Sequence, residues 1–573
     1  MLLPSQQRIS ALMRRLLLCC NSRHPSPSIT LFRHVIALNL SCSFLYGTFP
    51  SNSTLFFLQN LQSLNLALND FRDSKIPSEI SLFTRLKHLD VSSSGFSGQV
   101  PREIAHLPKL VSLNLSNSDL ILETTTLRNL VQNLSEVREL VLSGVNMTSV
   151  NPRFFMNLSS SLNTLDLFEC VLRGDFPNSI FRFPNLKNFY LSGNRNLTID
   201  FPSSNWSSPL QRLYLGDMDC GRRLPESIGD LKSLQSLSLS CNLEGSIPAS
   251  IGNLSQLTDL RLDNQFSGPI PASIDNNLSL RMNVNANFTL PKLTDVSFSS
   301  CNLSEFPNFI RDSIDLQSLV LSKNSIHGNI PEWICEKDDL EILDLSHNNL
   351  IGKIPNSLPK FLSVLNLQAN YFDGNIPFGF PEDCGLQNLN LHGNQMDGLL
   401  PRSLVNCSML EVLDIGNNNI EDTFPHWLES LPDLQVLVLR SNKFHGSVQS
   451  TKESPSFPKL RVLDLFSNDF RGPLPVQYIE NFKAMMDPHG EDGSPKYMKM
   501  STGANSYQYS LVVTWKGFDY ELQGILTVFS SIHLSNNKFE GEIPDVAILL
   551  LTEITPKSIA VHNPTEVARF VDT

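Results

Sequence analysis

The stretch LEILDLSHNNLIGKIP, residues 340–355, decides the fold of this 573-residue chain. Around Leu343 and Leu345 apolar and polar residues alternate, as in a strand with one buried face, and an Asn, a Gly and a Pro follow. We expect Ile342, Asp344 and Ser346 to face outward on the sheet side. The residues expected to point inward are Leu340, Leu343, Leu345, Leu350 and Ile354.

The same pattern recurs about every 24 residues for four hundred residues. The asparagines that keep this step are Asn324, Asn348, Asn370, Asn394, Asn418 and Asn442. The prolines are Pro307, Pro331, Pro355, Pro377, Pro401 and Pro425. Repetition of L-x-x-L-x-L-x-x-N at 20–29 residues is the signature of a leucine-rich-repeat solenoid. The sequence therefore predicts an α/β-type solenoid with a parallel β-sheet on its concave face and about eighteen or nineteen turns.

The repeated polar residues have structural roles. The Asn amide can bond to backbone groups where the chain turns, which predicts a ladder of asparagines inside the solenoid. Gly352 permits a tight bend, and Pro355 fixes the backbone that follows. The marks slip at residues 120–134 and 264–291, which predicts irregular turns there.

Composition argues for binding rather than chemistry. A formal charge of −12 argues against nucleic acid, whose protein partners present basic surfaces. The chain lacks a G-x-G-x-x-G loop, a G-x-S-x-G elbow and an H-E-x-x-H pair. We read Asp344 and Asp414 as single exposed carboxylates on a solvated face. The sequence thus predicts no enzyme, no cofactor and no metal site.

Asn-x-Ser/Thr sequons favour a secreted glycoprotein surface. The thirteen candidate glycosylation sites are Asn39, Asn52, Asn114, Asn133, Asn146, Asn157, Asn196, Asn205, Asn253, Asn277, Asn287, Asn302 and Asn406. The first twenty residues match a signal peptide poorly, and no run of 18 apolar residues predicts a membrane span.

Ten cysteines occur without a C-x-x-C pair. Cys384 and Cys407 occupy nearly equivalent positions of adjacent turns, where either a disulfide or two buried thiols fits. Four others fall near the ladder position and are expected to be buried and structural rather than reactive. They are Cys170, Cys220, Cys241 and Cys301.

The Gly-x-Ile-Pro half of the repeat resembles the plant-specific class of leucine-rich repeats, and so implies a horseshoe or superhelix. Segments 34–55, HVIALNLSCSFLYGTFPSNSTL, and 422–428, DTFPHWL, resemble plant leucine-rich-repeat receptor-like proteins of the Cf-type disease-resistance group. The resemblance covers about residues 34–544. The implied parts are a degenerate amino-terminal cap region 1–33, repeats 34–481, an island 482–525, a final repeat 526–544 and a non-repeat tail 545–573.

The repeat stops between residues 482 and 526, where a β-rich run, YQYSLVVTW, covers residues 507–515. One interpretation is a long loop with a hairpin lying over the solenoid. Cf-type proteins resemble this chain in having an island here with Tyr, eight residues and Lys-Gly, matched by Tyr507, Lys516 and Gly517. In that family the island and the repeats after it are linked to ligand and co-receptor contact.

Both ends depart from the family. No Trp follows Cys19-Cys20 as in the family's amino-terminal cap, and periodicity is lost after Pro544. The family would continue with further repeats, a cysteine cap, an acidic spacer and one membrane helix. We therefore expect a truncated product.

Outward-facing strand positions are the candidate binding residues, because aromatic and Arg side chains dominate binding hot spots. A solvated sheet face is the equally weighted alternative. The candidates are Phe168, Tyr190, Arg212, Tyr214, Asp217, Asp259, Arg261, Arg440 and Phe466. Their outward-facing neighbours are Asp166, Glu169, Asp263, Asp464 and His533.

The resemblance implies the extracellular recognition region of an immune receptor. Its partners would be a pathogen-derived protein or peptide ligand, a receptor-kinase adaptor and a co-receptor, without nucleic acid. It would lie on the extracellular face of the plasma membrane, held by a segment that this chain lacks, and a secreted fragment is the other possibility. The alternatives are a secreted inhibitor of microbial wall enzymes and a fragment of a receptor-kinase ectodomain.

Overall fold

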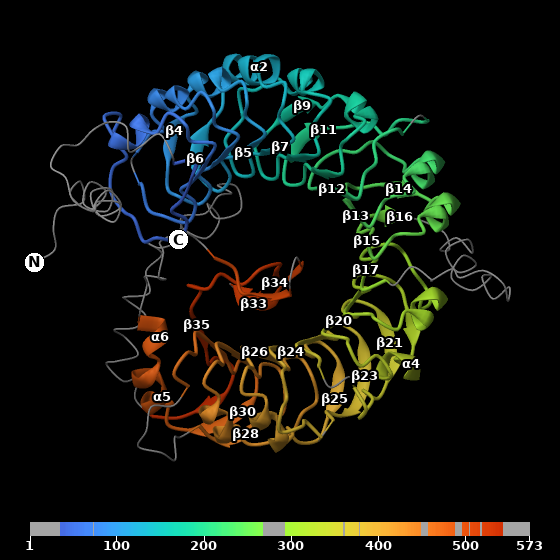
Figure 1. Ribbon diagram of the computed structural model, residues 1–573. Helices are drawn as coiled ribbons and strands as arrows, with labels where there is room; N and C mark the ends of the chain where they lie inside the picture. The colour runs from blue at the N-terminus through green and yellow to red at the C-terminus, as the bar shows by residue number, and fades with distance from the viewer. Residues whose placement is uncertain are drawn as a thin grey trace, which may run out of the picture. The chain divides into compact units, whose positions relative to one another are not determined.

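The chain forms two compact units, Met1–Leu293 and Thr294–Thr573, in a computed structural model. Each unit consists of stacked turns with one inner strand per turn, which confirms the predicted solenoid (Figure 1). The structure describes residues 35–541 except 73, 205, 267–292, 359–360, 378, 449–456, 487–495, 503–504 and 516–517. The expected cap region 1–33, the tail 545–573 and most of the irregular turn at 264–291 lie outside these residues.

The first unit has an inner sheet of parallel strands in which equivalent leucines lie in register, such as Leu64 beside Leu89. The strands are β1 Ala37–Asn39, β2 Ser63–Asn65, β3 His88–Asp90, β5 Ser112–Asn114, β7 Glu139–Val141, β8 Thr164–Asp166, β10 Asn188–Tyr190, β12 Arg212–Gly216, β13 Ser236–Ser240 and β15 Asp259–Arg261.

The second unit repeats this arrangement, with Leu343 of one strand beside Leu365 of the next. Its inner strands are β17 Asp295–Ser297, β18 Ser318–Val320, β20 Ile342–Asp344, β22 Val364–Asn366, β24 Asn388–Asn390, β26 Val412–Asp414, β27 Val436–Val438, β29 Val462–Asp464 and β35 Ser531–His533. The expected core residues Leu340, Leu343, Leu345, Leu350 and Ile354 are all buried.

A second set of short parallel strands lies after the asparagine of many turns, where the sequence predicted only a bend. Residues around Gly352 extend and pair with the next turn, as Ile351 does with Tyr371. Gly352 has φ +78°, and a Cβ there would lie 2.6 Å from Oδ1 of Asn329, so this position requires glycine. The strands are β4 Ser97–Gln99, β6 Asp119–Ile121, β9 Arg173–Asp175, β11 Asn196–Thr198, β14 Glu244–Gly245, β16 Gln265–Phe266, β19 His327–Gly328, β21 Asn349–Gly352, β23 Tyr371–Asn375, β25 Gln395–Asp397, β28 His445–Ser447, β30 Asp469–Gly472 and β36 Lys538–Phe539.

Short helical segments complete the turns. In the irregular turn at 120–134, α2 Thr124–Asn133 buries Leu127, Leu130 and Val131, which share one face of a helix. The other α-helices among the described residues are α4 Glu332–Cys335, α5 Val476–Asn481 and α6 Lys483–Met486. The 3₁₀ segments are η2 Thr54–Phe57, η3 Ser78–Leu82, η4 Arg102–His106, η5 Pro152–Asn157, η6 Asn178–Arg182, η7 Glu226–Asp230, η8 Ala249–Asn253, η9 Asn308–Asp312, η10 Arg402–Asn406 and η11 His426–Ser430.

The predicted asparagine ladder is present inside the solenoid. The Asn348 amide nitrogen donates to the carbonyls of Leu321 (2.9 Å) and Leu345 (3.1 Å), while its Oδ1 accepts from the backbone N–H of Ile326 at 3.0 Å. Leu321 and Ile326 belong to the preceding turn, so one side chain joins two turns. Equivalent bonds are made by Asn370, Asn394, Asn418 and Asn442.

The island contains two antiparallel hairpins. One pairs β31 Lys499–Thr502 with β32 Asn505–Gln508, and the other pairs β33 Leu511–Trp515 with β34 Phe518–Leu522. Strands β33 and β34 lie on the inner side of β24 and β26 (Figure 1). The hairpin predicted in the run 507–515 thus lies over the inner sheet of its own unit.

Candidate functional sites

An aromatic patch is built on neighbouring inner strands of the first unit, consisting of Phe168, Tyr190, Arg212, Tyr214, Asp259 and Arg261. Tyr190 of β10 and Tyr214 of β12 are in register, with ring centroids 5.0 Å apart at an interplanar angle of 80°. Both rings are half-buried. Burial raises the pKa of both hydroxyls, so the pair stays neutral.

Asp259, the acidic residue of the aromatic patch, forms hydrogen bonds with its neighbours Ser236 and Arg261. Asp259 is buried; its Oδ2 lies 2.6 Å from Oγ of Ser236, and its Oδ1 accepts from Nε of Arg261 at 3.1 Å. Oγ of Ser236 is also 2.8 Å from the Tyr214 hydroxyl. Asp259 and Arg261, both predicted as ligand-binding residues, therefore hold the Tyr214 side chain in place. Ser236 was not predicted, because a serine on a strand gives no signal.

The remaining predicted residues of the first unit face solvent. Phe168 is 42% exposed, and Arg212 and Asp217 are exposed as well. Nη1 of Arg212 donates a long hydrogen bond of 3.5 Å to Oδ1 of Asn188, and Arg212 also interacts with the Tyr190 hydroxyl. The structure therefore brings the tyrosines and Arg212 together and leaves the arginine accessible.

Many inner strands end in an Asp or Asn whose side-chain oxygen accepts a hydrogen bond from the backbone N–H two residues later. The sequence predicted solvated carboxylates at two of these positions, Asp344 and Asp414. Oδ1 of Asp166 accepts from the N–H of Phe168 at 3.1 Å, and Asp464 makes the same bond to Phe466 at 2.9 Å. Asp344 and Asp414 do so too, with Ser346 and Gly416 respectively, at 2.9 Å. These carboxylates close a turn at the strand end.

The prediction that Asp344 and Asp414 are exposed was wrong, and so was the exposure implied for Ile342 and Ser346. All four are buried, and Asp414 is 0% exposed. The reason is the island, which packs on the inner sheet and which the repeat pattern alone does not place. The covered face consists of the inner-sheet residues Ile342, Val364, Val412, Val436, Val438 and Val462. The island residues in the same buried cluster are Met498, Met500, Tyr509, Leu511 and Ile525.

Tyrosines of the island reach the strand ends of the covered face. The Tyr507 hydroxyl donates to Oδ2 of Asp344 at 2.7 Å and accepts from Nδ2 of Asn366 at 3.0 Å. Burial raises the pKa of Tyr507 well above its ordinary value, and burial also raises the pKa of Asp344. The Tyr509 hydroxyl donates to Oε1 of Gln387 at 3.1 Å. Tyr507 belongs to the island motif that the resemblance links to ligand and co-receptor contact. In the structure it fixes the island to the repeats. Lys516 and Gly517 lie outside the described residues.

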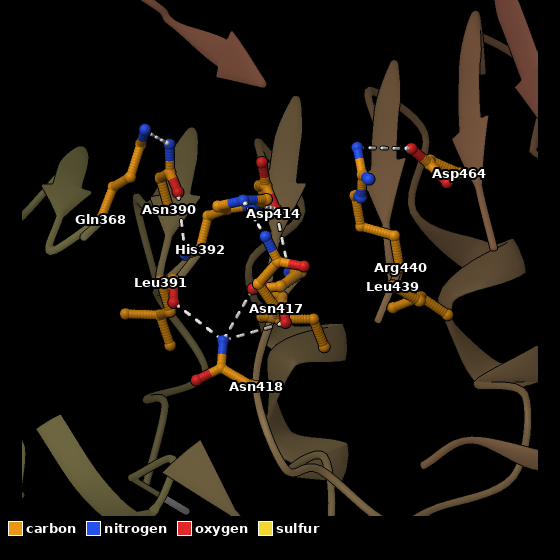
Figure 2. A network of polar contacts seen from close by, with 12 residues as sticks. Gln368, Asn390, Leu391, His392, Asp414, Asn417, Asn418, Leu439, Arg440 and Asp464 are labelled. Atoms are coloured by element: carbon orange, nitrogen blue, oxygen red, sulfur yellow. Dashed lines mark hydrogen bonds and ion pairs between the residues drawn. The ribbon is translucent and has the colours of Figure 1, made fainter. Parts of the chain in front are cut away.

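Charged pairs hold the edge of the second hairpin. Nη2 of Arg440 donates to Oδ1 of Asp519 at 3.1 Å. Nη1 of Arg440 lies 3.8 Å from Oδ2 of Asp464 (Figure 2). The guanidinium is 5.1 Å from the ring centroid of Phe466, which stacks on His533 at 4.7 Å. Arg440 is 2% exposed, so it is not an open ligand contact in this structure.

Two histidines that were not predicted as site residues, His347 and His392, pair with carboxylates near the island. Nε2 of His347 is 3.2 Å from Oε1 of Glu521 in β34, and the hydrogen bond from His347 is the largest cause that lowers the Glu521 pKa. Nδ1 of His392 is 3.0 Å from Oδ1 of Asp414, and its Nε2 is 3.0 Å from Nδ2 of Asn417 (Figure 2). Scattered histidines carry no motif, so their pairing appears only in the fold.

The described part of the chain contains two disulfides. The sulfur atoms of Cys384 and Cys407 are 2.01 Å apart, one of the two arrangements left open above. Cys220 and Cys241 are also joined, and both are buried, as the sequence predicted. The bond between them was not predicted. Adjacent turns bring their Cα atoms to 5.5 Å, which is within bonding range.

The sequon asparagines differ in exposure. Those exposed are Asn39, Asn52, Asn133, Asn146, Asn157, Asn196, Asn253 and Asn302. Asn114 and Asn406 are partly buried. Asn205, Asn277 and Asn287 lie outside the described residues.

Comparison with known proteins places the chain among plant receptors. Residues 384–444, 315–336 and 339–361 match leucine-rich-repeat families. Receptor-like protein 6 of Arabidopsis thaliana is 41% identical over 212 residues, 36% of this chain and 21% of that protein. Receptor-like protein Cf-9 of Solanum pimpinellifolium is 38% identical over 35% of this chain and 23% of its own length. Receptor-like protein 39 of Arabidopsis thaliana is 31% identical over 90% of this chain and 63% of its own length.

Solved structures agree with this placement. The ectodomain of the Arabidopsis receptor kinase HAESA, in complex with an IDA peptide hormone ligand, has a TM-score of 0.54 and 25% identity over 83% of this chain and 92% of that chain. The plant peptide hormone receptor RGFR1, in complex with RGF2, has a TM-score of 0.51 and 26% identity over 77% and 68%.

The fold and the relatives support a ligand-binding repeat region of the kind found in plant cell-surface receptors. The chain is similar to plant receptor-like proteins, among them the Cf-type protein Cf-9. Its matches span less than two thirds of the length of these curated relatives. Among the described residues no helix is long and apolar enough to cross a membrane.

Proposed function

We propose that this chain is the extracellular recognition region of an immune receptor-like protein at the plasma membrane. It binds a pathogen-derived protein or peptide and signals through a receptor-kinase adaptor and a co-receptor. The HAESA and RGFR1 structures contain peptide hormones, which supports a peptide or protein ligand for this related fold.

The aromatic patch carries the proposal. Its tyrosine pair and Arg212 are the kinds of side chain that contribute most to binding energy, and Arg212 is exposed. The corresponding inner sheet of the second unit is packed against the island, with Val412, Val436 and Tyr509 in one buried cluster. These observations support the proposal that the ligand contacts the first unit.

The test is ligand capture by the full chain displayed on plant cells. Secreted proteins and peptides of pathogens are the probe mixtures, and bound species are identified by mass spectrometry. We expect the double substitution Tyr190→Ala/Tyr214→Ala to lower capture about tenfold or more, because each buried aromatic anchor contributes on the order of 1–2 kcal/mol.

Tyr371→Ala is the matched control, because Tyr371 is an exposed tyrosine, 51% accessible, in the second strand set of the other unit. Hydrogen exchange of the inner strands reports whether the double variant is folded. Equal capture by the wild type and the folded double variant would remove the aromatic patch as the ligand site.

A further inference from the structure

The aromatic patch lies between two edges of opposite charge. On the edge where the strands begin, Lys187 and Arg212 are exposed. They are neighbours, because the Lys187 carbonyl accepts from the N–H groups of Gln211 (2.7 Å) and Arg212 (3.0 Å). This edge is basic.

On the edge where the strands end, Glu169 and Asp217 are exposed. Both have left-handed backbones, with φ of 52° and 49°, at equivalent positions of turns two apart. The turn between them has Gly193 at this position, and a Cβ on Gly193 would lie 2.6 Å from Cγ of Glu169. The glycine therefore leaves room for the Glu169 side chain to lie along this edge. This edge is acidic.

None of Lys187, Arg212, Glu169 and Asp217 is in an ion pair within the described part of the chain. By contrast, Arg261 in the same patch is paired with Asp259 at 3.1 Å. The charges of both edges are therefore available to a partner.

Arg212 and Asp217 are five residues apart along β12 and the residue that follows it. At about 3.3 Å per residue this separation is roughly 16 Å, the span of about five residues of an extended peptide. Tyr190 and Tyr214 lie between the two edges, so the order across the sheet is basic, aromatic, acidic.

We propose that the ligand segment is an extended peptide that crosses the inner sheet along the strand direction. An acidic residue lies on Lys187 and Arg212, a basic residue lies on Glu169 and Asp217, and an apolar side chain packs on the tyrosine pair between them. This inference rests on the proposed function and adds the chemistry of the segment, because charges of opposite sign across an interface favour one partner over another.

The probes are immobilised hexapeptides in the frame X-Gly-Φ-Φ-Gly-X, where Φ covers all apolar and aromatic residues and each X is Asp, Lys or Gln. We expect the full chain to bind Asp/Lys peptides about tenfold more tightly than Asp/Asp, Lys/Lys or Gln/Gln peptides. Raising the salt concentration should reduce this difference, because exposed charge pairs are screened.

The decisive variant is Lys187→Glu/Arg212→Glu, which makes both edges acidic. We expect its preference to switch to Lys/Lys peptides. The control Arg85→Glu/Lys109→Glu changes two exposed cations on other turns of the same unit and should retain the Asp/Lys preference. All four sites are exposed, so the variants are expected to fold.

The outcomes separate this inference from the proposed function. Peptides whose binding requires Tyr190 and Tyr214 but is indifferent to charge would overturn the charge order and leave the ligand site in place. Absence of any tyrosine-dependent peptide binding would overturn the charge order as well. The capture experiment on pathogen mixtures is a separate test. Equal capture by the wild type and the Tyr190→Ala/Tyr214→Ala variant would remove the aromatic patch as the ligand site.

Discussion

At the scale of single residues, two polar ladders with different roles run through the repeats. The inner ladder, exemplified by Asn348, joins one turn to the preceding turn through buried backbone groups. The second ladder, exemplified by Asp344, closes the end of its own strand. Both use short side chains that bond to the backbone, but only the first appeared as a fixed repeat in the sequence.

Removing one rung of the inner ladder should be costly. Asn348→Ala leaves the carbonyls of Leu321 and Leu345 and the N–H of Ile326 without their side-chain partner. Leaving buried polar groups unpaired costs about 1–3 kcal/mol. We expect faster hydrogen exchange in residues 318–352, measured by mass spectrometry. The control Asn349→Ala alters an exposed neighbour, and equal exchange in both variants would contradict the ladder's role.

His392 should make the second unit more stable in acid than in base. Burial lowers its pKa, but the charge and hydrogen bond of Asp414 raise it, and the net direction is upward. Arg440 opposes the protonated form and Asp519 favours it. A raised folded pKa gives stability that is complete below the unfolded pKa of 6.5 and is lost as the pH rises through the folded value.

The measurement is the melting temperature between pH 5.5 and pH 8.5. We expect the wild type to lose stability over this range and His392→Gln to lose less. His445→Gln removes an exposed histidine of the same unit and should keep the wild-type slope. Protonated His392 also requires Asn417 to present its oxygen in place of its nitrogen. Identical slopes for the wild type and His392→Gln would contradict the assignment.

At the scale of elements, the island acts as a cover for the inner sheet of the second unit. Its apolar residues Met498, Tyr509 and Leu511 pack on Val412 and Val436. Polar contacts such as those of Tyr507 and Arg440 surround this cluster. The island is therefore held by packing at its centre and by hydrogen bonds and ion pairs at its edges.

Tyr507→Phe tests the polar contact directly, because it removes the hydroxyl and retains the ring. Asp344 and Asn366 then lose a partner under the island, and the expected cost is about 1–3 kcal/mol. Hydrogen exchange in residues 505–522 should rise about tenfold. Tyr520→Phe, on the exposed side of β34, is the matched control. Unchanged exchange in Tyr507→Phe would show that packing alone holds the island.

At the scale of the whole molecule, the repeat period was enough to predict the solenoid, the buried leucines and the asparagine ladder. It could not predict which strands the island covers. The repeat pattern at an outward position such as Ile342 is the same whether the sheet there is exposed to solvent or covered. The pairing of His392 with Asp414 across turns was equally hidden. Tyr190 and Tyr214 were selected as aromatic residues at outward strand positions, and the structure shows that their rings contact each other. Their role in ligand binding stays a prediction.

Glycan occupancy should follow the exposure of the sequons if the chain is secreted as proposed. Asn146, Asn196 and Asn253 are exposed and should be occupied, whereas Asn114 and Asn406 are partly buried and should be occupied less. Nδ2 of Asn406, the atom to which a glycan would attach, also donates a hydrogen bond of 3.0 Å to the Phe380 carbonyl. Glycopeptide mass spectrometry of the chain produced in plant cells measures this occupancy. Absence of glycans from the exposed sequons would contradict an extracellular location, and full occupancy of Asn114 and Asn406 would contradict control by folded-state exposure.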